Sequence, residues 1–162
     1  MGDIIFFYTK EAGHMIEVLD AARYFLSLGS MQHKKLQKLC YYAQAWYLAL
    51  TGKILLNTEF EAWVHGPVSP KLYIRYRDWG GLIIPMVPYD SEKLDGHIRR
   101  FLQIIYNMYE DYSANDLEQL THKEEPWIEA RGGIAPTQIC RTRINTDTMR
   151  RFYGGLLSNG NG

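Results

Sequence analysis

The sequence predicts a mainly α-helical protein, a single compact helical domain around a central buried helix, with a small strand pair. Two observations point to this fold class. Residues 31–50 are apolar on almost every side in their second half, and segments before and after them repeat apolar residues three and four positions apart. Residues 60–64 instead place their side chains alternately on two faces, which is typical of a short strand. A length of 162 residues suits one domain with a substantial core.

The central segment, residues 31–50, carries an apolar stripe at helical spacing: Leu36, Leu39, Cys40, Ala43, Trp46, Tyr47 and Leu50. Tyr41, Ala45 and Leu48 lie on the opposite side, so we expect other elements or a partner to cover the last three turns. Lys34 and Lys38 indicate that the first two turns face solvent. The apolar run of about twelve residues is too short to span a bilayer, which needs roughly 20, so we expect a soluble protein without membrane contact.

Two elements are predicted before this helix. Residues 4–10 form a short apolar run, for which we consider an edge strand, an arm that binds a partner or an extension outside the domain. From Met15 onward, apolar residues return at helical spacing, which predicts an amphipathic helix that ends at Gly29. Ser30 is then the predicted N-cap of the central helix.

A strand and a short helix are predicted after the central helix. Residues 60–64 alternate between the two faces of a strand, and Gly66 and Pro67 are expected to end it. Ser69 is the predicted N-cap of the following helix, with Pro70 at its first position.

The second half of the chain is predicted to be helical apart from its loops. Glycines at residues 80–81 stop the short helix, and residues 82–89, with two prolines, are expected to form a loop with a few extended residues. A helix is predicted over residues 91–111. Ser113 and Asp116 have the spacing of a capping box, which starts another helix.

The C-terminal elements are predicted to be short. Trp127 follows a turn at Pro126 and indicates a half-buried helical turn. A last helix is predicted to begin at Asn145 or Thr146. Residues 158–162, with the sequence SNGNG, are expected to form a flexible tail.

Composition argues against several classes of function. Lysine plus arginine and aspartate plus glutamate both number 18, so no overall field attracts nucleic acid or an anionic membrane. The two cysteines, Cys40 and Cys140, are far apart and predict no disulfide framework, so we expect a cytoplasmic protein. Because there is no glycine-rich phosphate loop and the five histidines are scattered, we expect no cofactor and no metal.

One pair of residues has the chemistry of a nucleophile and a base. Cys40 and His65 would form a hydrolase site if the fold brought them together. Cys40, however, lies on the apolar face of the central helix, and no basic neighbour favours its thiolate. We therefore expect that the protein is not an enzyme.

Two basic clusters are candidates for phosphate contacts. Lys34, Lys35 and Lys38 lie near the start of the central helix. The second cluster, near the C-terminus, consists of Arg141, Arg143, Arg150 and Arg151. Since aromatic residues do not interleave with these side chains as single-strand binding requires, we favour a solvated face over a nucleic-acid site.

Residues 63–67, with the sequence WVHGP, are the most distinctive local pattern. Trp63 and His65 lie on the same side of the predicted strand, and a rigid Gly-Pro pair follows them. They form either the edge of a binding groove or a patch that packs against the central helix. The pattern does not choose between the two.

The WVHGP pattern lies within a longer stretch of sequence that resembles a known family. Residues 33–56, HKKLQKLCYYAQAWYLALTGKILL, and residues 59–73, EFEAWVHGPVSPKLY, resemble the signature of the Panacea domain, the SocA-like antitoxin family. The resemblance continues more weakly through residues 99–112, 113–127 and the C-terminal helix.

The resemblance implies one antitoxin domain over residues 15–157, preceded by an N-terminal extension at residues 1–14. It also implies a non-catalytic antitoxin of a bacterial or prophage toxin–antitoxin system. Such a protein silences a toxin, encoded by the adjacent gene, by binding the toxin directly. A ClpXP-type protease is a further implied partner, because at least one member of the family acts as an adaptor that delivers its toxin for degradation.

Large aromatic side chains dominate the energetics of protein interfaces. The predicted toxin-binding residues are therefore Tyr42, Trp63, His65, Tyr73 and Tyr76. The alternative hypothesis is a nucleic-acid-binding regulator of its own operon that uses Arg141, Arg143, Arg150 and Arg151.

Overall fold

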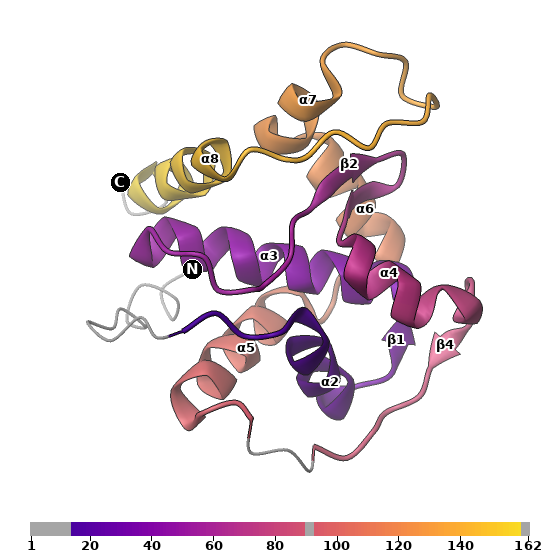
Figure 1. Cartoon of the computed structure of the whole chain (residues 1–162), viewed down its shortest axis with the longest axis vertical. Helices are drawn as coiled ribbons and strands as arrows, with labels where there is room; N and C mark the ends of the chain where they lie inside the picture. Colours follow the sequence, from indigo (N-terminus) through magenta and orange to yellow (C-terminus); the bar gives the residue numbers. More distant parts are fainter. Residues whose placement is uncertain (1–13, 90–92, 160–162) are drawn as a thin grey trace.

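Helix α3 (His33–Thr51) runs through the middle of the molecule (Figure 1). The computed structural model describes residues 14–89 and 93–159. The other helices are α2 Val18–Leu28, α4 Pro70–Tyr76, the 3-10 turn η1 Arg77–Trp79, α5 Gly96–Tyr109, α6 Ala114–His122, α7 Glu125–Arg131 and α8 Thr146–Asn159. The strands are β1 Met31–Gln32, β2 Glu61–Trp63, β3 Gly66–Val68 and β4 Ile83–Ile84. Strand β1 pairs with β4 and β2 with β3, both antiparallel, so the predicted mainly helical class with a small strand pair is confirmed.

Helix α3 is enclosed by its neighbours. Helices α2, α4, α5, α6 and α8 all contact it, and every residue from position 36 to 48 is buried. The enclosure of the second half agrees with the prediction. The prediction that the first two turns face solvent is wrong for Lys38, whose side chain lies buried beneath the β2–β3 hairpin. Within the described residues, no helix combines the length and apolar character needed to cross a membrane.

The start of α3 also differs from the prediction. The sequence favours Ser30 as the N-cap, but the N-cap residue is Gln32, which makes no side-chain cap hydrogen bond. The reason is that Met31 and Gln32 form β1 and pair with β4, a strand that lies far along the chain. Tertiary pairing therefore decides where this helix begins.

Helices α2 and α5 begin later than the sequence predicts. The backbone N–H of Ile16 donates to the carbonyl of Leu55 at 2.7 Å, which keeps the chain extended until α2 begins at Val18. Helix α5 begins at Gly96, where Asp95 supplies the cap. Residues 4–10, for which an edge strand, a partner-binding arm and an extension are considered, lie outside the described residues.

Other helix ends are where the sequence predicts them. Gly29 ends α2, Ser69 caps α4, and Ser113 and Asp116 form the capping box of α6. Asn145 caps α8 by accepting a hydrogen bond from a backbone N–H of its first turn. Helix α8 continues to residue 159, which extends it into the predicted tail.

The β2–β3 hairpin contains the WVHGP sequence. Gly66 and Pro67 are predicted to end a single strand, but both belong to the return strand β3, where Trp63 pairs with Gly66 and Ala62 with Pro67. Gly66 has a φ of 105°, which strongly favours glycine. A Cβ atom at this position would also clash with the Lys38 side chain. Glycine is therefore required here for two independent reasons.

A buried carboxyl group joins α3 to the C-terminal helices. Glu124, just before α7, accepts hydrogen bonds through Oε1 from the hydroxyl groups of Tyr42 (2.7 Å) and Tyr153 (2.9 Å). Because the proton of Tyr153 points to Glu124, its hydroxyl oxygen accepts from Tyr41 at 3.1 Å. Burial raises the pKa of Glu124 to about 7, although the two hydrogen bonds oppose this shift.

The substitution Glu124→Gln tests this network through the pH dependence of stability. The pKa of Glu124 is about 7 in the folded protein and usually 4.5, so the folded state binds more protons between these values. Its contribution to stability is fully present below pH 4.5 and is lost as the pH rises through 7. Relative to the variant, the wild-type free energy of unfolding should fall by on the order of 3 kcal/mol between pH 4.5 and 8. Urea denaturation measures this change, and parallel pH profiles of the two proteins would contradict it.

Candidate functional site

A groove with a volume of about 450 Å³ opens beside the start of α3. Its walls come from α3, the β2–β3 hairpin, helix α4 with η1, and residues 139–141. The lining residues are His33, Lys34, Gln37, Lys38, Trp63, Val64, His65, Val68, Tyr73, Arg77, Gly80, Ile139, Cys140 and Arg141. The groove therefore exists only once segments from distant parts of the chain have come together.

Aromatic side chains form one wall of the groove. Trp63 and Tyr73 meet edge to face with ring centroids 4.9 Å apart, and Tyr73 stacks on His33 at 5.7 Å. The guanidinium of Arg141 lies 5.5 Å from the ring centroid of Trp63, and the indole Nε1 donates to Glu61 at 2.8 Å. Trp63 is thus held in one orientation while part of its surface stays open. An anchored, partly exposed aromatic pair is typical of protein-binding surfaces.

The floor of the groove is polar and holds the hairpin in place. Lys38 Nζ donates to the carbonyl oxygen of Pro67 at 3.1 Å. The amide of Gln37 bonds to both backbone groups of Ser69, accepting from the N–H at 2.8 Å and donating to the carbonyl at 3.3 Å. These bonds join α3 to β3 and to the start of α4.

Two buried bases of α3 have lowered pKa values. Burial lowers the pKa of Lys38 to about 7, a shift that the charge of Glu118 opposes only in part. Burial also lowers the pKa of His33 to about 4, and the charge of Lys38 acts in the same direction. His33 is therefore neutral at pH 7.

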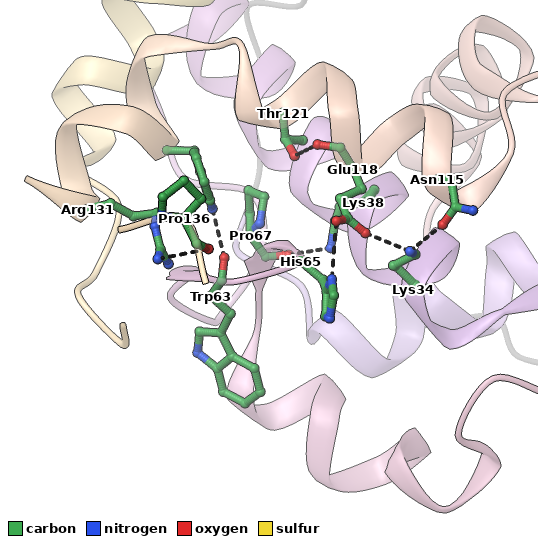
Figure 2. A network of polar contacts seen from close by, with 11 residues as sticks. Lys34, Lys38, Trp63, His65, Pro67, Asn115, Glu118, Thr121, Arg131 and Pro136 are labelled. Atoms are coloured by element: carbon green, nitrogen blue, oxygen red, sulfur yellow. Dashed lines mark hydrogen bonds and ion pairs between the residues drawn. The ribbon is translucent and has the colours of Figure 1, made fainter. Parts of the chain in front are cut away.

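A carboxylate from α6 interacts with Lys34 and with His65 at the edge of the groove (Figure 2). Lys34 Nζ donates to Glu118 Oε1 and to Asn115 Oδ1, both at 2.6 Å. His65 Nδ1 lies 3.2 Å from Glu118 Oε2, while 70% of the His65 side chain remains exposed. Burial raises the pKa of Glu118, but the hydrogen bonds from Lys34 and His65 outweigh burial, and the pKa lies below its usual value.

A buried arginine positions the segment that forms the remaining wall. The guanidinium of Arg131 donates to the carbonyl oxygens of Ala62 and Ala135, both at 2.9 Å, and of Gln138 at 2.6 Å. It also lies 4.9 Å from the ring centroid of Trp127. Arg131 thereby ties the chain before residues 139–141 to strand β2.

The structure places the predicted toxin-binding residues in two environments. Trp63, His65 and Tyr73 all line the groove. Tyr42 and Tyr76 are buried, with relative exposures of 0% and 4%, so a partner cannot reach them while the domain stays folded. Both are core residues, because their apolar rings face the interior of the fold.

The predicted C-terminal arginine cluster is divided in the structure. Arg141 lines the groove, whereas Arg143 and Arg151 form ion pairs with Glu59 (2.7 Å) and Glu125 (3.4 Å). These carboxylates neutralise two of the charges that a nucleic-acid site would need.

The residues considered for catalysis have different environments. Cys40 is completely buried, and burial raises the pKa of its thiol, so the reactive thiolate is disfavoured. His65 lies at the surface and interacts with Glu118 instead. Across residues 14–89 and 93–159, no group of three histidine, cysteine, aspartate or glutamate side chains is arranged to hold a metal ion.

Several residues of the site are absent from the sequence-based prediction. Arg77 and Ile139 line the groove but carry no local pattern that marks them. Arg131 had one usable signal, because it follows Trp127 by four positions on a helix, the spacing at which side chains stack. For the burial of Lys38, the one sequence signal is Gly66, because a glycine often marks a close approach of the backbone to another segment. In the structure the Gly66 backbone lies against the Lys38 side chain.

The fold is a small, mainly helical domain with a groove beside the start of its central helix. A family model described as antitoxin SocA-like, Panacea domain, matches residues 36–128, from α3 into α7. The chain belongs to this family. Residues 139–141 and helix α8 lie outside the matched range. Searches of curated proteins and of solved structures found no match.

The substitution Gly66→Ala tests the close contact between the hairpin and α3. The variant must adopt a φ of 105° with a side chain that clashes with Lys38, so it should lose on the order of 2 kcal/mol or more of stability. Gly81→Ala is the matched control, because nothing lies within 4 Å of a Cβ atom there and its φ is not left-handed. Thermal denaturation compares the two, and an equal effect of both substitutions would contradict the expectation.

The substitution Lys38→Met tests the buried charge in the floor. Between pH 7 and 10.5 the folded protein binds fewer protons than the unfolded chain, because the pKa of Lys38 is lowered to about 7. Its contribution to stability is present above pH 10.5 and is lost as the pH falls through 7. From pH 7 to 9, wild-type stability should rise by on the order of 2 kcal/mol relative to the variant. Urea denaturation checks this, and the exposed Lys53→Met should keep the wild-type profile.

Proposed function

We propose that residues 15–157 form an antitoxin domain that neutralises a cognate toxin protein in the cytoplasm. The toxin is encoded by the adjacent gene, and neutralisation is direct and non-catalytic. The toxin docks in the groove, where Trp63, His65 and Tyr73 are the contact residues. Membership of the SocA-like antitoxin family supports the role, and the groove supports the mode of binding.

The observation that carries this proposal is the Trp63–Tyr73 pair. Tyr73 is 37% exposed, and the ring of Trp63 is fixed by Tyr73, Arg141 and the Nε1 bond to Glu61. A side chain that is already ordered loses little conformational entropy when a partner binds, so less of the favourable contact energy is lost to ordering. Aromatic residues in such a position are the usual hot spots of interfaces.

Co-expression tests the proposal. Cells expressing the adjacent gene from an inducible promoter should stop growing, and this chain, supplied on a second plasmid, should restore growth and co-purify with the toxin. An adaptor for a ClpXP-type protease would instead lower the amount of toxin, and an operon regulator would bind operator DNA. A harmless neighbour, or rescue without any complex, would contradict direct neutralisation.

Alanine substitutions locate the interface. Trp63→Ala and Tyr73→Ala should each weaken toxin binding by on the order of 2 kcal/mol, or about 30-fold in Kd, because they remove the anchoring rings. Ile128→Ala is the control, since Ile128 is 49% exposed on α7 and does not line the groove. Isothermal titration calorimetry measures the affinities, and circular dichroism verifies the fold of each variant. If Ile128→Ala weakened binding as much as Trp63→Ala, the interface would lie elsewhere.

A further inference from the structure

The charged side chains that line the groove are all basic. Among the described residues of its lining, Lys34, Lys38, Arg77 and Arg141 carry basic groups, and none is an aspartate or glutamate. The whole chain, in contrast, has 18 residues of each sign. The local excess therefore arises from the fold, and it favours an anionic ligand.

The basic side chains differ in whether they already have partners. Lys34 pairs with Glu118 at 2.6 Å, and Lys38 donates to a backbone carbonyl. In the part of the chain that the structure describes, no carboxylate lies within 4.0 Å of the exposed guanidinium of Arg77 or Arg141. Guanidinium groups bind carboxylates through two parallel hydrogen bonds, so both can accept a carboxylate from outside.

The rest of the lining is apolar. Trp63, Tyr73 and Val68 border the groove, and Ile139 exposes 79% of its surface beside them. A ligand that fills this site must therefore present apolar surface as well as negative charge. Acidic residues next to an aromatic or aliphatic side chain in a protein segment meet both conditions.

The surroundings favour a protein over a nucleic acid. A phosphate backbone needs a row of available cations along its path. Arg143, two residues beyond Arg141, is paired with Glu59 at 2.7 Å, so its charge is already neutralised. Arg141 and Arg143 therefore do not form a row of available cations leading out of the groove, which suits a short segment.

We propose that the groove binds an acidic segment of the partner protein. Carboxylates of this segment pair with Arg77 and Arg141. An apolar side chain between them packs against Trp63 and Tyr73. The inference rests on the proposed function in one respect, namely that the partner is the toxin.

Nuclear magnetic resonance with the ¹⁵N-labelled full chain tests this binding without the toxin. The probes are the peptides acetyl-Glu-Leu-Phe-Glu-amide and acetyl-Gln-Leu-Phe-Gln-amide, which have nearly the same shape and differ in two carboxylates against two neutral carboxamides. The acidic peptide should shift the indole N–H signal of Trp63, assigned with Trp63→Phe, in a saturable way. The neutral peptide should bind at least tenfold more weakly, and added salt should weaken only the acidic one.

Matched variants show whether the two guanidinium groups are responsible. The double variant Arg77→Ala/Arg141→Ala should lose at least tenfold in affinity for the acidic peptide. Arg100→Ala, an exposed arginine of α5 outside the groove, should bind like the wild type. The inference is overturned if both peptides bind equally, if the double variant binds normally, or if a decathymidine oligonucleotide shifts the Trp63 signal and the acidic peptide does not.

Binding to the toxin separates this inference from the proposed function. If the toxin binds the wild type but the double variant binds it equally well, direct neutralisation stands and the acidic-segment inference falls. If the neighbouring gene product does not bind at all while the acidic peptide does, the proposed function fails and the specificity of the groove stands. If the double variant loses at least tenfold in toxin affinity and Arg100→Ala binds the toxin like the wild type, the proposed function and the acidic-segment inference are both supported.

Discussion

The burial of residues 36–48 of α3 on every side is the constraint on which the rest of the structure depends. Because every residue from position 36 to 48 is buried, each polar side chain in this stretch needs a partner inside the protein. Gln44 Oε1 accepts from the backbone N–H groups of Leu55 and Leu56, and Gln37 and Lys38 bind the chain around β3. The polar groups of one helix thereby determine where the connecting segments lie.

The shape of the groove also depends on the hydrogen bonds of Gln37 and Lys38. Hydrogen bonds from Gln37 and Lys38 fix the position of the hairpin on α3. On the opposite side, the Arg131 guanidinium donates to backbone carbonyl groups of β2 and of the segment before residues 139–141. Trp63 and Tyr73 are therefore presented from fixed supports rather than from mobile loops. Preorganisation of this kind lowers the entropic cost of association, which is how a small surface can bind a protein tightly.

Predictions from short sequence signals were confirmed where the structure depends on hydrogen bonds between residues close in sequence. Ser69 and Ser113 cap helices as predicted, because a cap hydrogen bond spans only three residues, and the last helix begins at Thr146, one of its two predicted starts. The predicted N-cap of α3, Ser30, was wrong because the observed start of the helix depends on the pairing of β1 with β4. Lys38 was expected in solvent because the hairpin that covers it lies later in the chain, and Gly66 by itself does not show which residue the hairpin approaches.

The sequence by itself determined the helical class and the resemblance to the antitoxin family. Periodicity and motifs are sufficient for these, since both are properties of neighbouring residues. Only the tertiary structure decided that Tyr42 is core and that Arg77 and Arg141 share a groove. Periodicity shows which face of a helix is apolar, but burial and local charge depend on contacts between segments that are distant in the chain.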